Sequence, residues 1–530
     1  MRAIKQLLIL SHRYVGIPLS FMFVLWFFSA YVMIYAGGMP KLTPAMQIDA
    51  AEPLQLQQVR LGPDALVEQT GYSPSQASLR TVLGRPVYEL RTPGFPLERY
   101  YADTGEAIDT LSEAQSRRLA SEFLGQPQDA LNLEGEVLSP DQWTLTESRS
   151  MPMYKYSLDD AAATEIYVSP GEARVVVATT DRTRLLSWLG TIPHWLYYAE
   201  LRLNQPLWYQ IMVWAAGIGT ALALLGLVLG VVQFRKKVRP FKLSRAIPYH
   251  GGMRWHYILG LVFGVTTLTW VFSGLVSMEP FAWTNTRGVG VDPQLFDGGE
   301  LDLAAFPALD TPAVAALLPA DTKRLDFVWK QGRPHLLASH AVPHEVDAKR
   351  DRLHQPYNIN GQSQAATVLL DATTLQVREN FDQELLVSQL AGSVSEGQVT
   401  DVALLDDYDD YYYSRQGELP LPVLRVKFDD PMRSWIYVDP HRAELLSLIH
   451  KNSRVERWLY NGLHSLDFAF WYHKRPLWDI GVLTLLTGGF LSSLLGLYFG
   501  LRRLKYDLGR AWHWVAELLR KRGQRALDGV

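Results

Sequence analysis

Four long runs of uncharged, mostly apolar residues constrain this 530-residue chain more than any other feature. They cover residues 14–36, 208–232, 255–278 and 480–501. Each run holds about 20 residues or more, the length that an α-helix needs to cross the hydrocarbon core of a membrane. We therefore predict a membrane protein with four transmembrane helices.

Lysine and arginine residues indicate how these helices are oriented, because cytoplasmic flanks carry the excess of positive charge. Basic residues precede the first run, fill the link between the second and third, and follow the fourth: Arg2, Lys5, Arg13; Arg235, Lys236, Lys237, Arg239, Lys242, Arg245; Arg502, Arg503, Lys505. Both termini are predicted to be cytoplasmic, and the two long segments between helices one and two and between helices three and four are predicted to lie outside, in the periplasm if the cell is a Gram-negative bacterium. The first run is too long and too aromatic for a removable signal peptide, so we expect a retained helix.

The sequence repeats itself along its length. One set of residues recurs at a displacement of 244, from His12, Gly16, Trp26, Phe28, Ser29 and Val32 to His256, Gly260, Trp270, Phe272, Ser273 and Val276. A second set recurs at a displacement of 270; it includes Arg184, Trp188, His194, Trp208, Gly226 and Gly230, which reappear as Arg454, Trp458, His464, Trp478, Gly496 and Gly500. We predict two parallel helix–domain–helix repeats, related by an axis along the membrane normal.

The predicted plan is an α+β membrane protein with one extracytoplasmic domain in each repeat. Its parts are a cytoplasmic start with helix one (1–36), domain A (37–182), an interfacial helix with helix two (183–234), a basic cytoplasmic link (235–254), helix three (255–279), domain B (280–453), an interfacial helix with helix four (454–503) and an amphipathic cytoplasmic tail lying on the inner leaflet (504–530). Helical composition covers residues 54–69 and 112–124. Turn residues between apolar stretches predict hairpins at 99–108, 165–176, 368–377 and 435–446.

Composition and missing motifs exclude several function classes. The chain has no cysteine, which rules out disulfides, iron–sulfur clusters and covalently attached c-type haem. A formal charge of -3 does not favour a nucleic-acid partner. The chain also has neither a Gly-x-Gly-x-x-Gly stretch after a strand nor a phosphate loop. Any electrons must therefore come from a separate donor, a quinol or a cytoplasmic reductase, and ATP-driven transport is disfavoured.

Four histidines occupy repeat-related positions. His12 and His256 lie at the cytoplasmic starts of helices one and three, and His194 and His464 lie outside, about a dozen residues before helices two and four. This pattern gives one histidine pair near each membrane face, and bis-histidine ligation of b-type haem, two haems in all, suits a protein without cysteine. Two alternatives stay open: a ligand pair could form within one half, or the histidines are boundary residues beside glycines that serve helix packing.

A polar cluster in the second outside segment is a candidate acceptor site. It contains Asp406, Asp407, Asp409, Asp410, Tyr411 and Tyr412. Oxygen ligands suit a hard cation such as ferric iron; the alternative is a solvated acidic loop with tyrosines packed on the sheet. Asp467 is a candidate to orient the His464 ring. A looser group, His335, His340, His344 and His354, matches no standard metal motif.

Several motifs together resemble bacterial inner-membrane proteins with PepSY-like periplasmic domains and a PepSY-associated transmembrane region. These motifs are His12-Arg13-Tyr14-x-Gly16, the Tyr-Val-Asp-Pro type of hairpin, and the stretch Arg457-Trp458-Leu459-Tyr460-x-Gly462-Leu463-His464-Ser465-Leu466-Asp467-Phe468. Some members of this family resemble haem-containing ferric-siderophore reductases. The resemblance thus implies PepSY-like domains, membrane lipid as surroundings and a periplasmic iron complex as partner.

The leading functional prediction is a haem-b oxidoreductase that passes electrons across the membrane to a periplasmic acceptor, ferric-siderophore iron. The rival is a non-redox membrane protein whose PepSY-like domains bind peptides or regulate a protease. A permease is disfavoured because no charged residue lies inside the four apolar runs.

Overall fold

The structure is a computed structural model that describes residues 2–36, 38–71, 73–234, 246–282, 290–292, 294–309, 312–343, 363–394, 396–413 and 419–527. The chain forms two compact units. One, the helical unit, contains Met1–Ile34, Trp188–Trp283 and Val455–Val530, and the other, the sheet unit, contains Tyr35–Ser187 and Thr284–Arg454. The mixture of helix and sheet agrees with the predicted α+β class.

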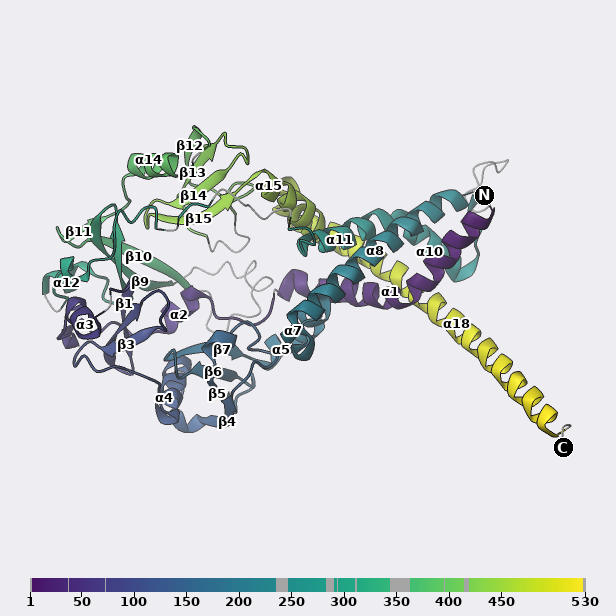
Figure 1. Cartoon of the computed structure of the whole chain (residues 1–530), viewed down its shortest axis with the longest axis horizontal. Helices are drawn as coiled ribbons and strands as arrows, with labels where there is room; N and C mark the ends of the chain where they lie inside the picture. Colours follow the sequence, from purple (N-terminus) through teal and green to yellow (C-terminus); the bar gives the residue numbers. More distant parts are fainter. Residues whose placement is uncertain are drawn as a thin grey trace. The chain divides into compact units, whose positions relative to one another are not determined.

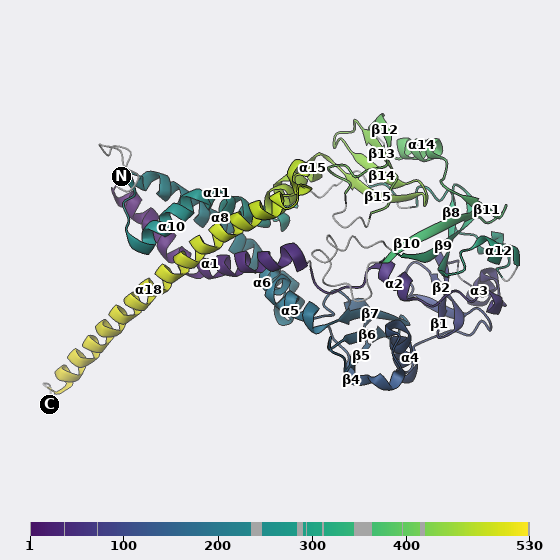
Figure 2. The same ribbon diagram turned by 180° about the vertical axis from the view of Figure 1, so that it is seen from behind.

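Three helices of the helical unit are long and apolar enough to cross a membrane (Figures 1 and 2). They are α1 (Arg2–Ala36), α8 (Gln205–Gln233) and α18 (Leu477–Leu527). The third apolar run is not the single straight helix that we predicted. It forms α10 (Gly251–Val262) and α11 (Gly264–Ser277), which meet at Phe263 and are bent by 61°.

The predicted ends of the long helices also differ from the structure. α1 begins at Arg2, so His12 lies inside this helix and not at its start. α18 continues without a break beyond Arg503 to Leu527, so the tail is an extension of this helix and not a separate one. Arginine and lysine have good helix propensity, which lets a helix run past its apolar stretch. The basic link 235–245 lies outside the described residues.

Short helices lead into α8 and α18. Before α8 come α5 (Asp181–Leu189), α6 (Thr191–Trp195) and α7 (Ala199–Leu203). Before α18 come α15 (Lys451–Arg457), a π-helical turn η5 (Trp458–Gly462), α16 (Leu463–Ser465) and α17 (Ala469–Tyr472).

A seven-stranded antiparallel sheet joins strands from both outside segments, in the order β11-β10-β9-β8-β1-β2-β3. Its strands are β1 (Gln76–Val82), β2 (Arg85–Arg91), β3 (Glu98–Tyr101), β8 (Thr322–Lys330), β9 (Arg333–Pro343), β10 (Ser363–Asp371) and β11 (Gln376–Arg378). β1 and β8 pair with Leu79 opposite Leu325. The two outside segments therefore share one sheet, whereas we had expected a separate domain in each repeat.

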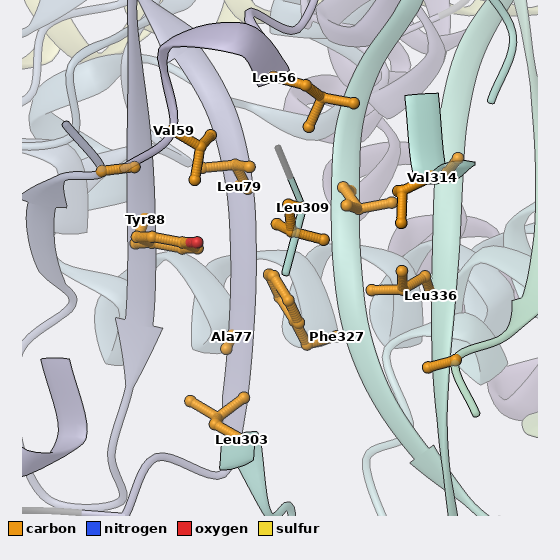
Figure 3. Close-up of a cluster of buried hydrophobic side chains, with 14 of the residues drawn as sticks. Leu56, Val59, Ala77, Leu79, Tyr88, Leu303, Leu309, Val314, Phe327 and Leu336 are labelled. Carbon is orange, nitrogen blue, oxygen red and sulfur yellow. The ribbon is translucent and has the colours of Figure 1, made fainter. Parts of the chain in front are cut away.

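One face of this sheet carries an apolar core (Figure 3). Leu79, Tyr88 and Phe327 point into it from the strands. Short helical elements supply further apolar residues: η1 (Leu56–Gln58), α3 (Pro63–Thr70), η4 (Leu303–Ala305) and α12 (Pro312–Leu317). α2 (Pro44–Ala50) also belongs to this unit. Because strand side chains alternate between faces, the polar residues of the same strands gather on the opposite face.

Two four-stranded sheets complete the sheet unit. The first is β4 (Leu131–Val137), β5 (Met153–Leu158), β6 (Glu165–Ser169) and β7 (Arg174–Thr179), with α4 (Glu113–Leu124), η2 (Gln128–Ala130) and η3 (Ser148–Ser150). The second is β12 (Val399–Leu405), β13 (Val423–Phe428), β14 (Trp435–Asp439) and β15 (Glu444–Ile449), with α14 (Gln383–Ser393). Ser112 caps α4 in a capping box with Gln115, as the helical prediction for 112–124 requires.

The hairpin predictions are confirmed where two strands meet at a tight turn. β6 pairs with β7, β10 with β11 and β14 with β15. The 99–108 stretch contributes β3 and a single bridge between Tyr100 and Ala107. The predicted helix over 54–69 divides into η1 and α3, because Pro63 starts a new helix.

Candidate functional site

We call His194 and His464 the outer pair, after the side of the membrane predicted for them. Both lie in short helices that lead toward α8 and α18. His194 belongs to α6 and His464 to α16. Both helices end at a leucine in the left-handed conformation, Leu196 with φ 51° and Leu466 with φ 51°. A tryptophan side chain forms a hydrogen bond to the backbone at the end of each short helix. Trp208 Nε1 donates to the Trp195 carbonyl at 2.7 Å, and Trp478 Nε1 donates to the Leu466 carbonyl at 3.0 Å. The same local structure therefore positions both rings.

A serine of α1 fixes the tautomer of His194. Ser29 Oγ donates its only proton to the Trp26 carbonyl at 3.0 Å, and it lies 2.9 Å from His194 Nδ1. The hydroxyl must then accept from Nδ1–H, because it has no second proton to give. The proton sits on Nδ1, which leaves the lone pair on Nε2 of His194.

His464 has the same arrangement with a serine of α11. Ser273 Oγ donates to the Trp270 carbonyl at 2.9 Å and lies 3.0 Å from His464 Nδ1. Nδ1 also lies 3.1 Å from the Trp270 carbonyl, which can only accept. Histidines that bind metals usually donate their other ring N–H in this way, which fixes the ring and its tautomer.

The rings of His194 and His464 lie next to each other in the helical unit, in an edge-to-face arrangement. Their centroids are 6.1 Å apart and their planes are inclined by 77°. Two imidazoles that share one metal through nitrogen bonds of about 2.0 Å have centroids roughly 6 Å apart. Burial lowers the pKa of His194 to about 3, and the neighbouring His464 ring lowers it further. Burial also lowers the pKa of His464, so both rings are neutral near pH 7. The pair fits the ligand set of a bis-histidine haem.

His12 and His256, which we call the inner pair, have backbone carbonyls in place of serine hydroxyls beside their rings. His256 Nδ1 donates to the Ser492 carbonyl at 3.0 Å. The Leu222 carbonyl faces His12 in the same way, although Nδ1 of His12 is buried without a hydrogen bond of ordinary geometry to any described residue. The two rings lie close enough for a positive charge on one to repel a positive charge on the other.

Glycines sit against three of the four imidazoles. A β-carbon at Gly226 of α8 would lie 2.9 Å from His12 Cε1, and one at Gly496 of α18 would lie 3.3 Å from His256 Cε1. A β-carbon at Gly274 would lie 3.6 Å from His464 Cε1. Gly226 and Gly230 both let α8 approach a neighbouring helix closely, Gly226 beside His12 of α1 and Gly230 beside Leu261 of α10.

Asp467 does not orient the His464 ring, so that prediction is wrong. Its carboxylate pairs with Arg457 at 3.8 Å, and Arg457 also donates to the Asp467 carbonyl at 3.2 Å. Both side chains are buried, and the π-helical turn η5 lies between Arg457 and His464. Sequence reasoning missed the role of Ser29 and Ser273, although both belong to the residues that recur at a displacement of 244.

The acidic cluster has one member with a clear structural role. Asp409 accepts from Tyr437 at 2.9 Å, from Arg425 at 2.9 Å and from the backbone N–H groups of Tyr411 and Tyr412. The Tyr412 ring is buried and stacks on Tyr437, with centroids 5.1 Å apart. Burial and the Asp409 carboxylate raise the pKa of Tyr437. Asp406, Asp407 and Asp410 lie in the same loop before β13.

The same contact occurs in the first four-stranded sheet, where Tyr167 donates to Asp141 at 2.9 Å. Asp409 and Tyr412 therefore serve at least to hold the loop onto the sheet.

The looser histidine group is described only in part. His335 and His340 lie on β9, and His335 packs against Phe381 with ring centroids 4.8 Å apart. His344 and His354 lie outside the described residues. Within the described part of the chain, no group of three or more His, Cys, Asp or Glu residues is arranged to hold a metal ion.

Comparisons with known proteins do not add to this description: neither the protein-family models nor the curated proteins contain a match to this chain.

Proposed function

We propose that the chain is a haem-b membrane oxidoreductase that passes electrons to an extracytoplasmic acceptor, the iron of a ferric siderophore. The observation that carries the proposal is the outer pair: two partly buried imidazoles 6.1 Å apart, each with Nδ1–H held and Nε2 free to bind. Haem b, when bound, supplies a one-electron iron couple.

The roles of the chain's own residues follow from their contacts. His194 and His464 would hold one haem, and His12 and His256 would hold a second. Ser29, Ser273 and the facing carbonyls keep the rings in the ligating tautomer. Residues 12 and 29 of α1 are 17 positions apart, which corresponds to roughly 26 Å along a helix. Such a span lets two centres carry electrons from one side of the membrane to the other.

The proposal includes four membrane crossings, with the bent α10–α11 pair as one broken span and both termini in the cytoplasm of a bacterium. Equivalent contacts support two parallel repeats: Ser29–His194 matches Ser273–His464, and Gly226–His12 matches Gly496–His256. The electrons come from an external donor, a quinol or a cytoplasmic reductase. The PepSY-like family resemblance supports the same reading.

The first prediction concerns haem content. Protein purified in detergent after expression with added haem precursor should show a strong Soret band and two haems per chain. Replacing His194 and His464 by alanine should remove one haem, and replacing His12 and His256 should remove the other, because each pair ligates one iron. Pyridine haemochrome analysis measures the stoichiometry, and His473→Ala, outside both pairs, is the matched control. A colourless but folded wild-type protein would contradict the proposal.

A non-redox function is the second candidate, and a cleft in the sheet unit favours it. The cleft has a volume of about 1860 Å³ and is lined by both polar and apolar residues, many of them on the seven-stranded sheet. A PepSY-type binding or protease-regulating protein would use such a cleft without haem. It predicts that the variant lacking all four histidines keeps its function.

A further inference from the structure

The far part of α18 carries apolar side chains that the described part of the chain leaves exposed. Every residue from 508 to 517 is exposed. Leu501, Leu508 and Val515 have exposed fractions of 53 %, 61 % and 42 %. This part of the helix extends away from α1, α8 and α10, which belong to the same unit (Figures 1 and 2). A row of exposed apolar residues is typical of an interaction surface.

The spacing of these residues is that of a coiled coil. Leucine, alanine or valine recurs at alternating intervals of three and four residues along α18. We call this set the α18 seam, and it consists of Leu494, Leu497, Leu501, Leu504, Leu508, Ala511, Val515 and Leu518. In heptads written abcdefg, the seam occupies every a and d position, through which paired α-helices pack against each other. A strict seven-residue period favours a partner helix that winds around α18 in a left-handed supercoil.

Neither α1 nor the membrane surface covers the whole seam. α1 meets α18 beside the seam, where Tyr14 donates to Asp507 at 3.0 Å, a g position, while Leu508 stays exposed. α18 is one continuous helix that has no break after Leu501, where its apolar run ends. A helix that crosses the bilayer must bend before it can lie along the surface. The seam beyond Leu501 therefore extends into water.

The charges around the seam are compatible with a second copy of the same helix. Arg502, Arg503 and Arg510 occupy b and c positions, which point away from the partner in a coiled coil. In a parallel pair, each g residue faces the e residue of the partner's next heptad. This rule places Asp507 opposite Trp512 of the second copy, and it brings no two like charges together. Two copies in one membrane also have the same orientation and depth, which aligns their seams.

We propose that the chain forms a parallel homodimer in which the α18 seams of two copies pair as a coiled coil. Each seam packs against the seam of the second copy, so apolar surface that is exposed in one chain becomes buried in the dimer. The membrane holds both helices close together, which raises their effective concentration. This inference rests on the membrane crossing of α18 in the proposed function, and it requires no haem.

Single cysteines test the pairing, because the chain has none of its own. Leu504→Cys and Leu508→Cys place a thiol at a d and at an a position of the full-length protein. In membranes treated with a mild oxidant, both should form disulfide-linked dimers roughly ten times faster than the outer variants, because facing seam thiols lie within disulfide range. The outer variants are Arg510→Cys at a c position and His513→Cys at an f position. Non-reducing electrophoresis measures the yield of dimer with time.

A charge placed in the seam gives an independent test. The wild type in detergent should have the mass of two chains, measured by light scattering coupled to size-exclusion chromatography. Leu508→Lys should have the mass of one chain, because pairing would bury two like charges opposite each other. His513→Lys is the matched control, since it adds the same charge on the outer face and should stay dimeric.

Each outcome decides the proposal. A monomeric wild type, equal cross-linking at seam and outer positions, or a dimer that persists in Leu508→Lys overturns it. A monomer in which the thiols of Leu504→Cys and Leu508→Cys are shielded from a water-soluble maleimide overturns it in favour of a helix that lies on the membrane surface. A dimer that cross-links through the seam but binds no haem would refute the proposed function and leave this inference standing.

Discussion

Two serine hydroxyls determine which nitrogen of each outer imidazole carries its proton. Ser29 and Ser273 each have one proton, and each gives it to a tryptophan carbonyl one helical turn earlier. The histidine that faces each hydroxyl must therefore donate. His464 also reaches the Trp270 carbonyl, and the Trp26 carbonyl faces His194 in the equivalent way. Each ring of the pair therefore has a serine hydroxyl and a tryptophan carbonyl beside it.

Ser29→Ala should weaken haem binding at the outer site by roughly 10- to 100-fold, the usual cost of removing the group that orients a metal-binding histidine. Ser273→Ala should have a similar effect, because in both variants a tryptophan carbonyl remains as the partner of the imidazole. Titration of haem into the apoprotein measures the affinity. Ser277→Ala is the control, since Ser277 bonds only within its own helix to Gly274. Equal affinities for Ser29→Ala and wild type would show that the hydroxyl does not position the ring.

The candidate site was predictable at this scale only in part. Repetition of His12, His194, His256 and His464 singled out the four rings from the sequence, and it also contained Ser29 and Ser273. The partnership of serine and histidine joins residues 165 positions apart, so nothing local to the histidine reveals it. Asp467 was the nearest carboxylate in sequence, but its buried arginine partner satisfies it instead.

At the scale of single elements, glycines set how closely the helices approach the inner rings. Helices α8 and α18 present Gly226 and Gly496 to His12 and His256. Apolar run length predicted that these helices exist, because a membrane-length helix needs little else. The break at Phe263 was not predictable, since no proline marks it; there a β-carbon at Gly264 would lie 2.7 Å from Leu227.

Gly226→Ala should displace the His12 ring and weaken the inner haem site roughly tenfold, or about 1.4 kcal/mol. The new β-carbon would lie 2.9 Å from His12 Cε1, a distance that forces the ring to move. Folding should not suffer, because alanine favours a helix over glycine. Gly217→Ala on the same helix is the matched control, since a β-carbon there meets nothing within 4 Å. The readout is the haem stoichiometry and the spectrum of each site; an unchanged inner site would contradict this reading.

At the scale of the whole chain, the shared sheet ties the two halves together. β1 and β8 pair although they lie more than 240 residues apart in the chain. Hairpins were predictable because their turn residues are local, as at Ser169-Pro170-Gly171 between β6 and β7 and at Asp439-Pro440 between β14 and β15. Pairing between distant strands carries no such local mark, which explains why two separate domains were expected.

Glu89 is a buried carboxylate at the centre of this sheet. Its titration predicts how the stability of the protein varies with pH. Burial alone would raise its pKa, but Arg80, Arg324 and Arg99 outweigh burial and lower the pKa to about 2. The unfolded chain has a glutamate pKa of about 4.3. The folded protein therefore gains stability from this group above the unfolded pKa, and loses it as the pH falls from about 4 toward 2.

Glu89→Gln should destabilise the sheet unit by about 3 kcal/mol at pH 7, because it leaves buried guanidinium groups without their shared counterion. The loss should shrink as the pH approaches 3, because the glutamate of the unfolded wild type is then protonated, so ionisation of Glu89 in the folded state contributes less stability. Thermal unfolding of the full chain in detergent at pH 7 and pH 3 measures both differences. Glu122→Gln is the control, because Glu122 pairs with Arg118 on the exposed side of α4. If the difference in stability between wild type and Glu89→Gln were the same at pH 7 and pH 3, the Glu89 carboxylate would not be the group that stabilises the neighbouring arginines.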